Sequence, residues 1–255
     1  MASVAALKLM KPSGRKIVAA VVYDYQMALV ADRAGVDIVS AGDSVGVTLW
    51  AQRSESEVTL EQMLLVCQAI RRGAARALVS CDVPLRELEA GGDAPLRAAT
   101  RLAKDGGADI VKIDAGVCSH DALRAVAHAG IPVWAQLGVR GEPDAAATER
   151  LIDEARALEA AGASLLDFRH SGPAAGPAVV AAVAIPVIGG LGGGPWLDGR
   201  VRSIAAAIGY LASAIDDRAE RYANVGADAL NAIRTMCDDV RAGRPLRGEA
   251  AARRA

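Results

Sequence analysis

The sequence lacks several features that mark common protein classes. It has no CxxC pair, no apolar run near the roughly 18 to 20 residues that span a bilayer, and no signal-peptide order at its N-terminus. Lys and Arg number 29 against 30 acidic residues, and the two signs are interspersed. We therefore expect no nucleic-acid or membrane surface, and a cytoplasmic protein whose partner is a small molecule.

The first strand-like segment is not followed by a GxGxxG motif. Short runs rich in Val, Ile and Leu recur without strict alternation, as in strands buried on both faces, and helical patterns lie between them. Seven such alternations, without the dinucleotide-binding motif, predict an α/β fold, a closed (β/α)8 TIM barrel that forms one domain over residues 1–255. The predicted strands are Lys16–Val22, Val36–Ala41, Ala77–Cys81, Asp109–Ile113, Ile131–Leu137, Ser164–Phe168 and Ile185–Gly189.

The remaining elements follow from weaker patterns. An eighth strand is expected near Val201–Ile208, and Asp216–Arg241 is expected to be helical with one break near Gly226. Residues 243–255 form a polar tail that we expect to be frayed. Thr59 and Gln62 have the spacing of a capping box. Glycines that follow the helical patterns are expected in the left-handed conformation that ends a helix, at Gly35, Gly73, Gly107, Gly130 and Gly162.

Polar side chains follow three of the predicted strands. Asp43 and Ser44 come after the second strand, Asp82 after the third, and Lys112 and Asp114 close the fourth. In parallel barrels the reacting groups gather where strands end, and residues two apart in a strand point the same way. The three carboxylates would repel one another unless a cation lies between them, and oxygen ligands suit Mg2+ or Mn2+.

Each of these residues also has an alternative role. A single Asp in this position commonly caps its own loop or pairs with a basic side chain. Lys112 has two interpretations as well, because it can bind a substrate carboxylate as a cation or form a Schiff base as a neutral amine. The neighbouring Asp114 favours the charged form, and thus carboxylate binding.

The order and spacing of several longer motifs resemble one known family. They are YDYQMALVADRAGVDIVSAGDSVG, SEVTLEQM, AIRRGAARALVSCDVP, GGADIVKIDAG, AGIPVWAQLGV, ALEAAGASLL, IPVIGG followed by DGR, and RYANVGADALNAIRTMCDDVRAG. Together they cover roughly residues 14–243 and are similar to ketopantoate hydroxymethyltransferase (3-methyl-2-oxobutanoate hydroxymethyltransferase), a family of the phosphoenolpyruvate mutase and isocitrate lyase barrels. The resemblance implies a homo-oligomeric, Mg2+-dependent enzyme of pantothenate biosynthesis that transfers a tetrahydrofolate-borne one-carbon unit to a 2-oxo acid.

The resemblance also implies roles for single residues. Asp43 and Asp82 would bind the metal, directly or through water, and Asp114 would stand where the family has a Glu near that metal. Ser44 and Lys112 would hold the carboxylate of the 2-oxo acid, with Asp82 beside them. The metal would polarise the substrate carbonyl and stabilise the enolate that forms when the next carbon loses a proton.

Two positions depart from the family. Its catalytic Glu at the end of the sixth strand aligns with Arg169, and its fifth-strand His aligns with Gln136. The family's glycine-rich loop after the fifth strand is replaced by the short stretch Arg140–Ala146. Arg is not a general base at neutral pH, because its pKa stays above about 12.

The residues leave open how these departures are compensated. Asp167 shares a strand face with Arg169 and is one candidate for a relocated base, and His170 is another. Two alternatives are an ion pair between Asp167 and Arg169 in the barrel mouth, and a role for Arg169 in binding a second anionic group of the substrate.

Three functions follow, of which the leading one is a metal-dependent hydroxymethyltransferase that forms a carbon-carbon bond through an enolate. The second is a diverged lyase, aldolase or decarboxylase that acts on a 2-oxo acid without folate. The third is a catalytically silent paralogue kept as a binding partner.

Overall fold

The computed structural model describes residues 3–138 and 144–248, and the chain divides into two compact units, Met1–Arg202 and Ser203–Ala255. The first unit contains a closed parallel barrel in which every strand pairs with the next one along the chain, as the sequence predicts. Its strands are β1 (Ile17–Val22), β2 (Ile38–Ala41), β3 (Leu78–Asp82), β4 (Ile110–Asp114), β5 (Val133–Gly138), β6 (Leu165–Arg169), β7 (Val187–Gly189) and β8 (Gly199–Ser203).

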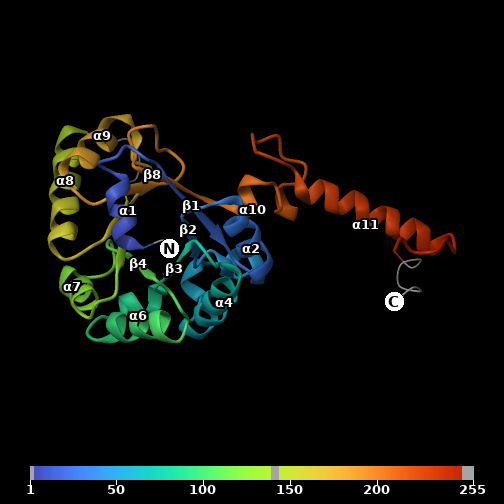
Figure 1. The fold of residues 1–255 in the computed structure, drawn as a ribbon, viewed down its shortest axis with the longest axis horizontal. Helices are drawn as coiled ribbons and strands as arrows, with labels where there is room; N and C mark the ends of the chain where they lie inside the picture. The colour runs from blue at the N-terminus through green and yellow to red at the C-terminus, as the bar shows by residue number, and fades with distance from the viewer. Residues whose placement is uncertain (1–2, 139–143, 249–255) are drawn as a thin grey trace. The chain divides into compact units, whose positions relative to one another are not determined.

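Helices connect the strands and lie outside the barrel (Figure 1). The larger connecting helices lie between consecutive strands, where the sequence has helical patterns. They are α2 (Tyr25–Ala34), α4 (Leu60–Gly73), α6 (Ala94–Lys104), α7 (His120–His128), α8 (Ala145–Ala160) and α9 (Gly172–Ala182). Shorter elements are α1 (Val4–Met10), α3 (Val45–Trp50), the 3-10 turn η1 (Glu55–Glu57) and α5 (Leu85–Glu89).

Local sequence signals explain where α4 begins and how α2 ends. Thr59 and Gln62 form the predicted capping box, which satisfies two free N–H groups of the first turn of α4. Gly35 ends α2 at a φ of 90°, in the left-handed region that favours glycine. The prediction for Gly73 was wrong, because it is the last residue of α4 and its φ is not positive. A side chain there would lie 2.7 Å from the carbonyl oxygen of Tyr25, so Gly73 allows α2 and α4 to pack closely.

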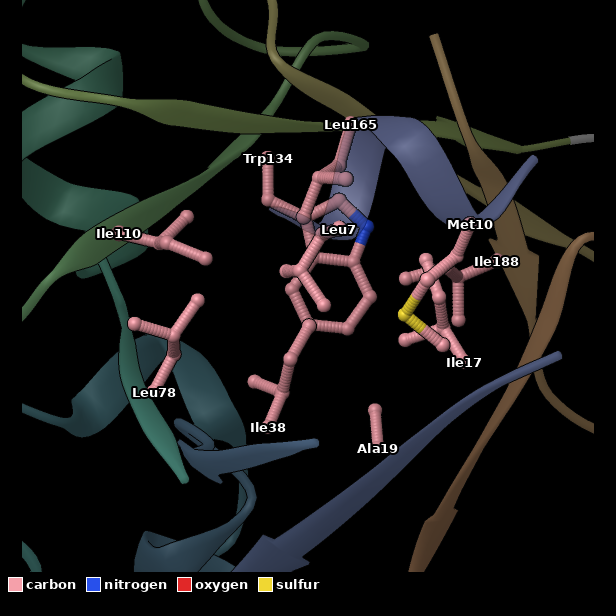
Figure 2. Packing of buried hydrophobic residues seen from close by; sticks show 10 residues of the cluster. All are labelled: Leu7, Met10, Ile17, Ala19, Ile38, Leu78, Ile110, Trp134, Leu165 and Ile188. Atoms are coloured by element: carbon pink, nitrogen blue, oxygen red, sulfur yellow. The ribbon is translucent and has the colours of Figure 1, made fainter. Parts of the chain in front are cut away.

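The lower half of the barrel is apolar. Figure 2 shows Leu7 and Met10 of α1 meeting the fully buried Trp134 of β5 among inward-pointing side chains from the other strands. These strand side chains are Ile17, Ala19, Ile38, Leu78, Ile110, Leu165 and Ile188. The short helix α1 thus contributes to this core, which leaves the other end of the barrel for polar groups.

The eighth strand lies earlier than predicted. It covers Gly199–Ser203, and Ile204–Ala207 forms the short helix α10 instead. Arg200 and Arg202 alternate with less exposed residues, so the strand lacks the continuous apolar run that marks the others. A side chain at Gly199 would collide with the backbone of Ile17, so glycine permits the close approach that completes the barrel. The Ala-rich segment that followed favours helix.

The second unit contains α10, the 3-10 turn η2 (Ala212–Ala214) and the long helix α11 (Val225–Arg241). The predicted start of this last helix at Asp216 was wrong, because the side chain of Asn224 caps the first turn by accepting from the N–H of Ala227. Most of the stretch 140–146, and the end of the predicted frayed tail, lie outside the described residues. Within the described chain, no helix is both long enough and apolar enough to cross a membrane.

Candidate active site

A cavity of about 150 Å³ opens at the carboxyl ends of the barrel strands. Its wall combines acidic, basic and amide side chains from strands β3 to β6 with residues of the loops after β2 and β3. The lining residues are Asp43, Ser54, Glu55, Ser56, Asp82, Val83, Leu85, Leu88, Lys112, Asp114, Gln136 and Arg169. The structure therefore brings Asp43, Asp82 and Asp114 to one mouth, together with Lys112, Gln136 and Arg169.

The strand register places these side chains. Asp82 pairs with Lys112 across β3 and β4, and Asp114 pairs with Gln136 across β4 and β5. Gln136 in turn pairs with Asp167 of β6. Since strand side chains alternate between faces, all of them point to the same side of the sheet as the apolar residues below. Local apolar patterns mark most of the strands, but the register between strands determines which polar groups meet.

Lys112 and Asp167 form a buried ion pair just above the apolar core. The Lys112 Nζ lies 2.6 Å from Asp167 Oδ2, and the side chains are 9% and 2% exposed. The same ammonium lies 5.1 Å from the ring centre of Trp134. Burial by itself would lower the pKa of Lys112, but the charges of Asp167 and Asp82 raise it above its ordinary value. Lys112 is therefore a cation, which disfavours a Schiff base.

Asp43 and Asp82 face each other at the cavity wall. The backbone N–H of Asp43 donates to Asp82 Oδ2 at 3.3 Å, while Asp82 Oδ1 is buried and has no hydrogen-bond partner within the described part of the chain. Burial, together with the charge of Asp43, raises the pKa of Asp82 to about 7. Burial and the charge of Glu55 likewise raise the pKa of Asp43. Two neighbouring carboxylates repel each other when both are ionised, and a cation bound between them would relieve that repulsion.

Asp114 is held by its neighbours. Its Oδ2 accepts a hydrogen bond of 2.7 Å from Gln136 Nε2, and its Oδ1 accepts one of 2.9 Å from the backbone N–H of Gly116. The second contact is the loop-capping role that the sequence left open for each Asp. Because both oxygens are engaged, Asp114 is better placed to bind a metal-bound water than the ion itself.

The fit of a divalent metal depends on these donors. Over residues 3–138 and 144–248, no group of three or more His, Cys, Asp or Glu side chains is close enough to form a complete metal cage. Mg2+ sites commonly use one or two carboxylates and fill the remaining positions with water and substrate oxygens. Asp43 and Asp82 supply such a pair, and the unpartnered Asp82 Oδ1 supplies a buried donor atom. The donor set fits an open, substrate-completed site.

Arg169 lines the cavity at the position where the resembled family has its base. In the described residues it forms no ion pair with Asp167, whose partner is Lys112. The strand partner of Arg169 is Gly138. The proposed Asp167–Arg169 ion pair was therefore wrong, and Asp167 is already occupied by a cation.

Two other predicted residues lie at the edge of this arrangement. His170 follows β6 with a φ of 50°, and it is not among the residues that line the cavity. Its ring lies near Gly192, at the loop after β7. Ser44 does not line the cavity either, and its hydroxyl hydrogen-bonds the Tyr23 hydroxyl at 3.0 Å.

The loop after β2 contributes residues that strand ends do not reveal. Ser54, Glu55 and Ser56 line the cavity, and η1 is fixed by Arg86, whose Nε donates to the carbonyl of Ser56 at 2.9 Å. The sequence pattern of this stretch is typical of a polar loop. The one feature that could have identified it as part of the site is its position between a barrel strand and the capped start of α4. Barrel enzymes draw site residues from such loops.

Comparisons with known proteins identify the family of the chain. The family model described as ketopantoate hydroxymethyltransferase matches residues 1–245. The chain is 31% identical over 253 residues to 3-methyl-2-oxobutanoate hydroxymethyltransferase of Alkalilimnicola ehrlichii, covering 94% of this chain and 91% of that protein. The enzyme of the same name from Geobacillus kaustophilus is also 31% identical, over 91% of this chain and 87% of that protein.

Solved structures show the same fold at lower sequence identity. Phosphonopyruvate hydrolase has a TM-score of 0.66 at 14% identity, over 98% of this chain and 91% of that chain. The 2,3-dimethylmalate lyase structure, of the PEP mutase/isocitrate lyase superfamily, has a TM-score of 0.64 at 17% identity, over 94% of this chain and 88% of that chain. On the family match and the two curated relatives together, the chain belongs to the ketopantoate hydroxymethyltransferase family.

Proposed function

We propose that the chain is a metal-dependent enzyme that forms a carbon-carbon bond at the enolate of a 2-oxo acid, with 3-methyl-2-oxobutanoate as substrate and methylenetetrahydrofolate as one-carbon donor. One observation carries the proposal: a small cavity at the barrel mouth sets the facing carboxylates Asp43 and Asp82 beside a charged lysine, Lys112. Family membership supplies the reaction class.

Asp43 and Asp82 would hold Mg2+ or Mn2+, and Asp114 would contact it through water. When bound, the metal would polarise the carbonyl of the 2-oxo acid and stabilise the negative charge of its enolate. Lys112 uses one of its three N–H donors on Asp167, which leaves donors for the substrate carboxylate. Ser44 is the second proposed carboxylate ligand, and Tyr23 orients its hydroxyl.

Gln136 has a positioning role in this proposal. Its amide N–H group donates to Asp114 at 2.7 Å, which orients that carboxylate toward the cavity. Its amide oxygen stays available as an acceptor. An amide does not titrate near neutral pH, so Gln136 would not replace a histidine as an acid or base.

A second candidate function is favoured by Arg169. A guanidinium in the cavity, without an ion-pair partner in the described chain, can bind a carboxylate or phosphonate in a bidentate way. This fits a lyase, aldolase or decarboxylase acting on a 2-oxo acid that carries a second anionic group, with no folate. The two candidates share metal and 2-oxo acid binding and differ in the second substrate.

The test is product formation by purified protein supplied with Mg2+, 3-methyl-2-oxobutanoate and methylenetetrahydrofolate. We expect ketopantoate to form, and to be abolished by a chelator and by Asp82→Asn, while Asp93→Asn at an exposed helix start has no effect. No turnover, combined with tight binding of a 2-oxo diacid that Arg169→Ala weakens, would favour the second candidate. Failure to bind metal and any 2-oxo acid would support the silent paralogue.

One further variant tests whether Arg169, which stands at the position of the family's catalytic Glu, is the sole obstacle to hydroxymethyl transfer. Arg169→Glu restores a carboxylate at the position of the family base. A gain of hydroxymethyl transfer would show that the base alone is missing, whereas no gain would also implicate the stretch 140–146. The homo-oligomer and the cytoplasmic location stay predictions, and light scattering on the purified protein measures the first.

A further inference from the structure

The carboxylates of the barrel mouth differ in how many of their oxygens are already engaged by an ion pair, by hydrogen bonds or by the proposed metal. Asp167 is bound to Lys112, and Asp114 accepts hydrogen bonds on both oxygens. Asp43 and Asp82 face each other as the proposed metal ligands. Asp167 keeps one oxygen without a partner among the described residues, but neither Asp167 nor His170 lines the cavity, and the guanidinium of Arg169 is not a base. Enolate formation nevertheless requires a base close to the substrate carbon.

Glu55 is the remaining carboxylate that lines the cavity. Its side chain is exposed toward the opening, and no described residue donates a hydrogen bond or forms an ion pair with it. Its negative charge also contributes to raising the pKa of Asp43, one of the proposed metal ligands. A solvent-facing carboxylate at the rim can also exchange its proton with water between turnovers.

The backbone around Glu55 is fixed. The Ser54 side chain accepts a hydrogen bond of 3.2 Å from the Ser56 N–H, and the carbonyl of Ser56 accepts one of 2.9 Å from Arg86 Nε. Val58 directly after the turn is fully buried, which anchors the segment to the core. These contacts hold Glu55 on a defined turn, so its carboxylate is presented to the cavity.

We infer that Glu55 is the general base that removes the proton from the carbon next to the carbonyl of the bound 2-oxo acid. The inference rests on the proposed function and assigns the step that Arg169 cannot perform. In this step the C–H bond breaks and its proton moves to a Glu55 carboxylate oxygen. The electron pair of that bond forms a carbon-carbon double bond, and the carbonyl π pair moves to oxygen, giving the enolate. The reverse step returns a proton from Glu55 to carbon.

Exchange of this proton for deuterium tests the inference without a second substrate. Protein with Mg2+ and 3-methyl-2-oxobutanoate in D2O is followed by proton NMR, which measures loss of the signal at the third carbon. A general base contributes roughly 10² to 10⁴-fold, so we expect Glu55→Gln to slow exchange by about that factor. The dissociation constant of the 2-oxo acid, measured by calorimetry, should stay within about threefold of the original value, because Glu55 acts on the C–H bond.

Glu57→Gln is the matched control, since Glu57 lies on the same turn but does not line the cavity. It should exchange at the original rate, and Glu55→Asp should retain part of the activity. Exchange by the original protein that persists in Glu55→Gln would overturn the assignment alone. No exchange by the original protein would contradict the proposed function and, with it, the role of Glu55. Weakened 2-oxo acid binding in Glu55→Gln, with the rate at saturation unchanged, would identify a binding residue and overturn the role as base.

Discussion

The buried ion pair between Lys112 and Asp167 should contribute measurably to the free energy of unfolding. At a separation of 2.6 Å and an effective dielectric constant of about 20, the direct attraction is roughly 6 kcal/mol before the cost of desolvation. Removing one partner leaves the other charge buried, which typically costs about 3 to 5 kcal/mol. We therefore expect Lys112→Met and Asp167→Leu each to lower the free energy of unfolding by that amount.

The double variant separates the pair from its surroundings. Replacing both charges by apolar side chains removes the penalty of an unpaired charge, so the double variant should be more stable than either single one. Urea unfolding at pH 7, followed by tryptophan fluorescence, measures the four free energies, and Lys104→Met at an exposed helix end is the control. Single losses below about 1 kcal/mol that add in the double variant would refute the coupling.

Three further predictions concern stability. In metal-free protein the folded state raises the pKa of Asp82 from 3.8 to about 7, so the folded state binds this proton more tightly than the unfolded state. The free energy of unfolding should therefore fall, by up to about 4 kcal/mol, as pH rises from 4 through 7, and a profile unchanged by Asp82→Asn would exclude this cause. Trp134→Ala should lower the free energy of unfolding by about 3 to 5 kcal/mol, because it empties the centre of the apolar layer; a urea midpoint near the original would contradict this. Thr59→Ala should cost about 1 kcal/mol through loss of the α4 cap, Thr59→Ser should cost less, and equal melting temperatures for both variants would argue against capping.

Much of the barrel was predictable because its strands follow from local apolar runs. Ile17–Val22 consists of Ile, Val and Ala alone, and Ile38–Ala41 is buried at every position, so apolar residues without strict alternation mark both segments. β8 was misplaced because Arg200 and Arg202 interrupt its apolar pattern. The position of this strand depends on closure against β1 at Gly199, which is a tertiary effect that a sequence window does not contain.

The candidate site was predictable to the extent that strand ends determine it. Asp43, Asp82 and Asp114 meet at one cavity because the carboxyl ends of parallel strands meet there. The partner of Lys112 was not predictable in the same way, since Asp167 lies two strands away and reaches it through the barrel interior. Glu55 was missed because its place in the cavity depends on how the loop after β2 folds over the mouth.

The central proposal is that the carboxylates of the mouth hold a metal which in turn holds a 2-oxo acid. Titration calorimetry of 3-methyl-2-oxobutanoate into chelator-treated protein, with and without Mg2+, tests it most directly. We expect binding only when Mg2+ is present, and loss of that binding in Asp82→Asn but not in Asp93→Asn. Equal affinity with and without Mg2+ would contradict the proposal, as would binding that Asp82→Asn leaves intact.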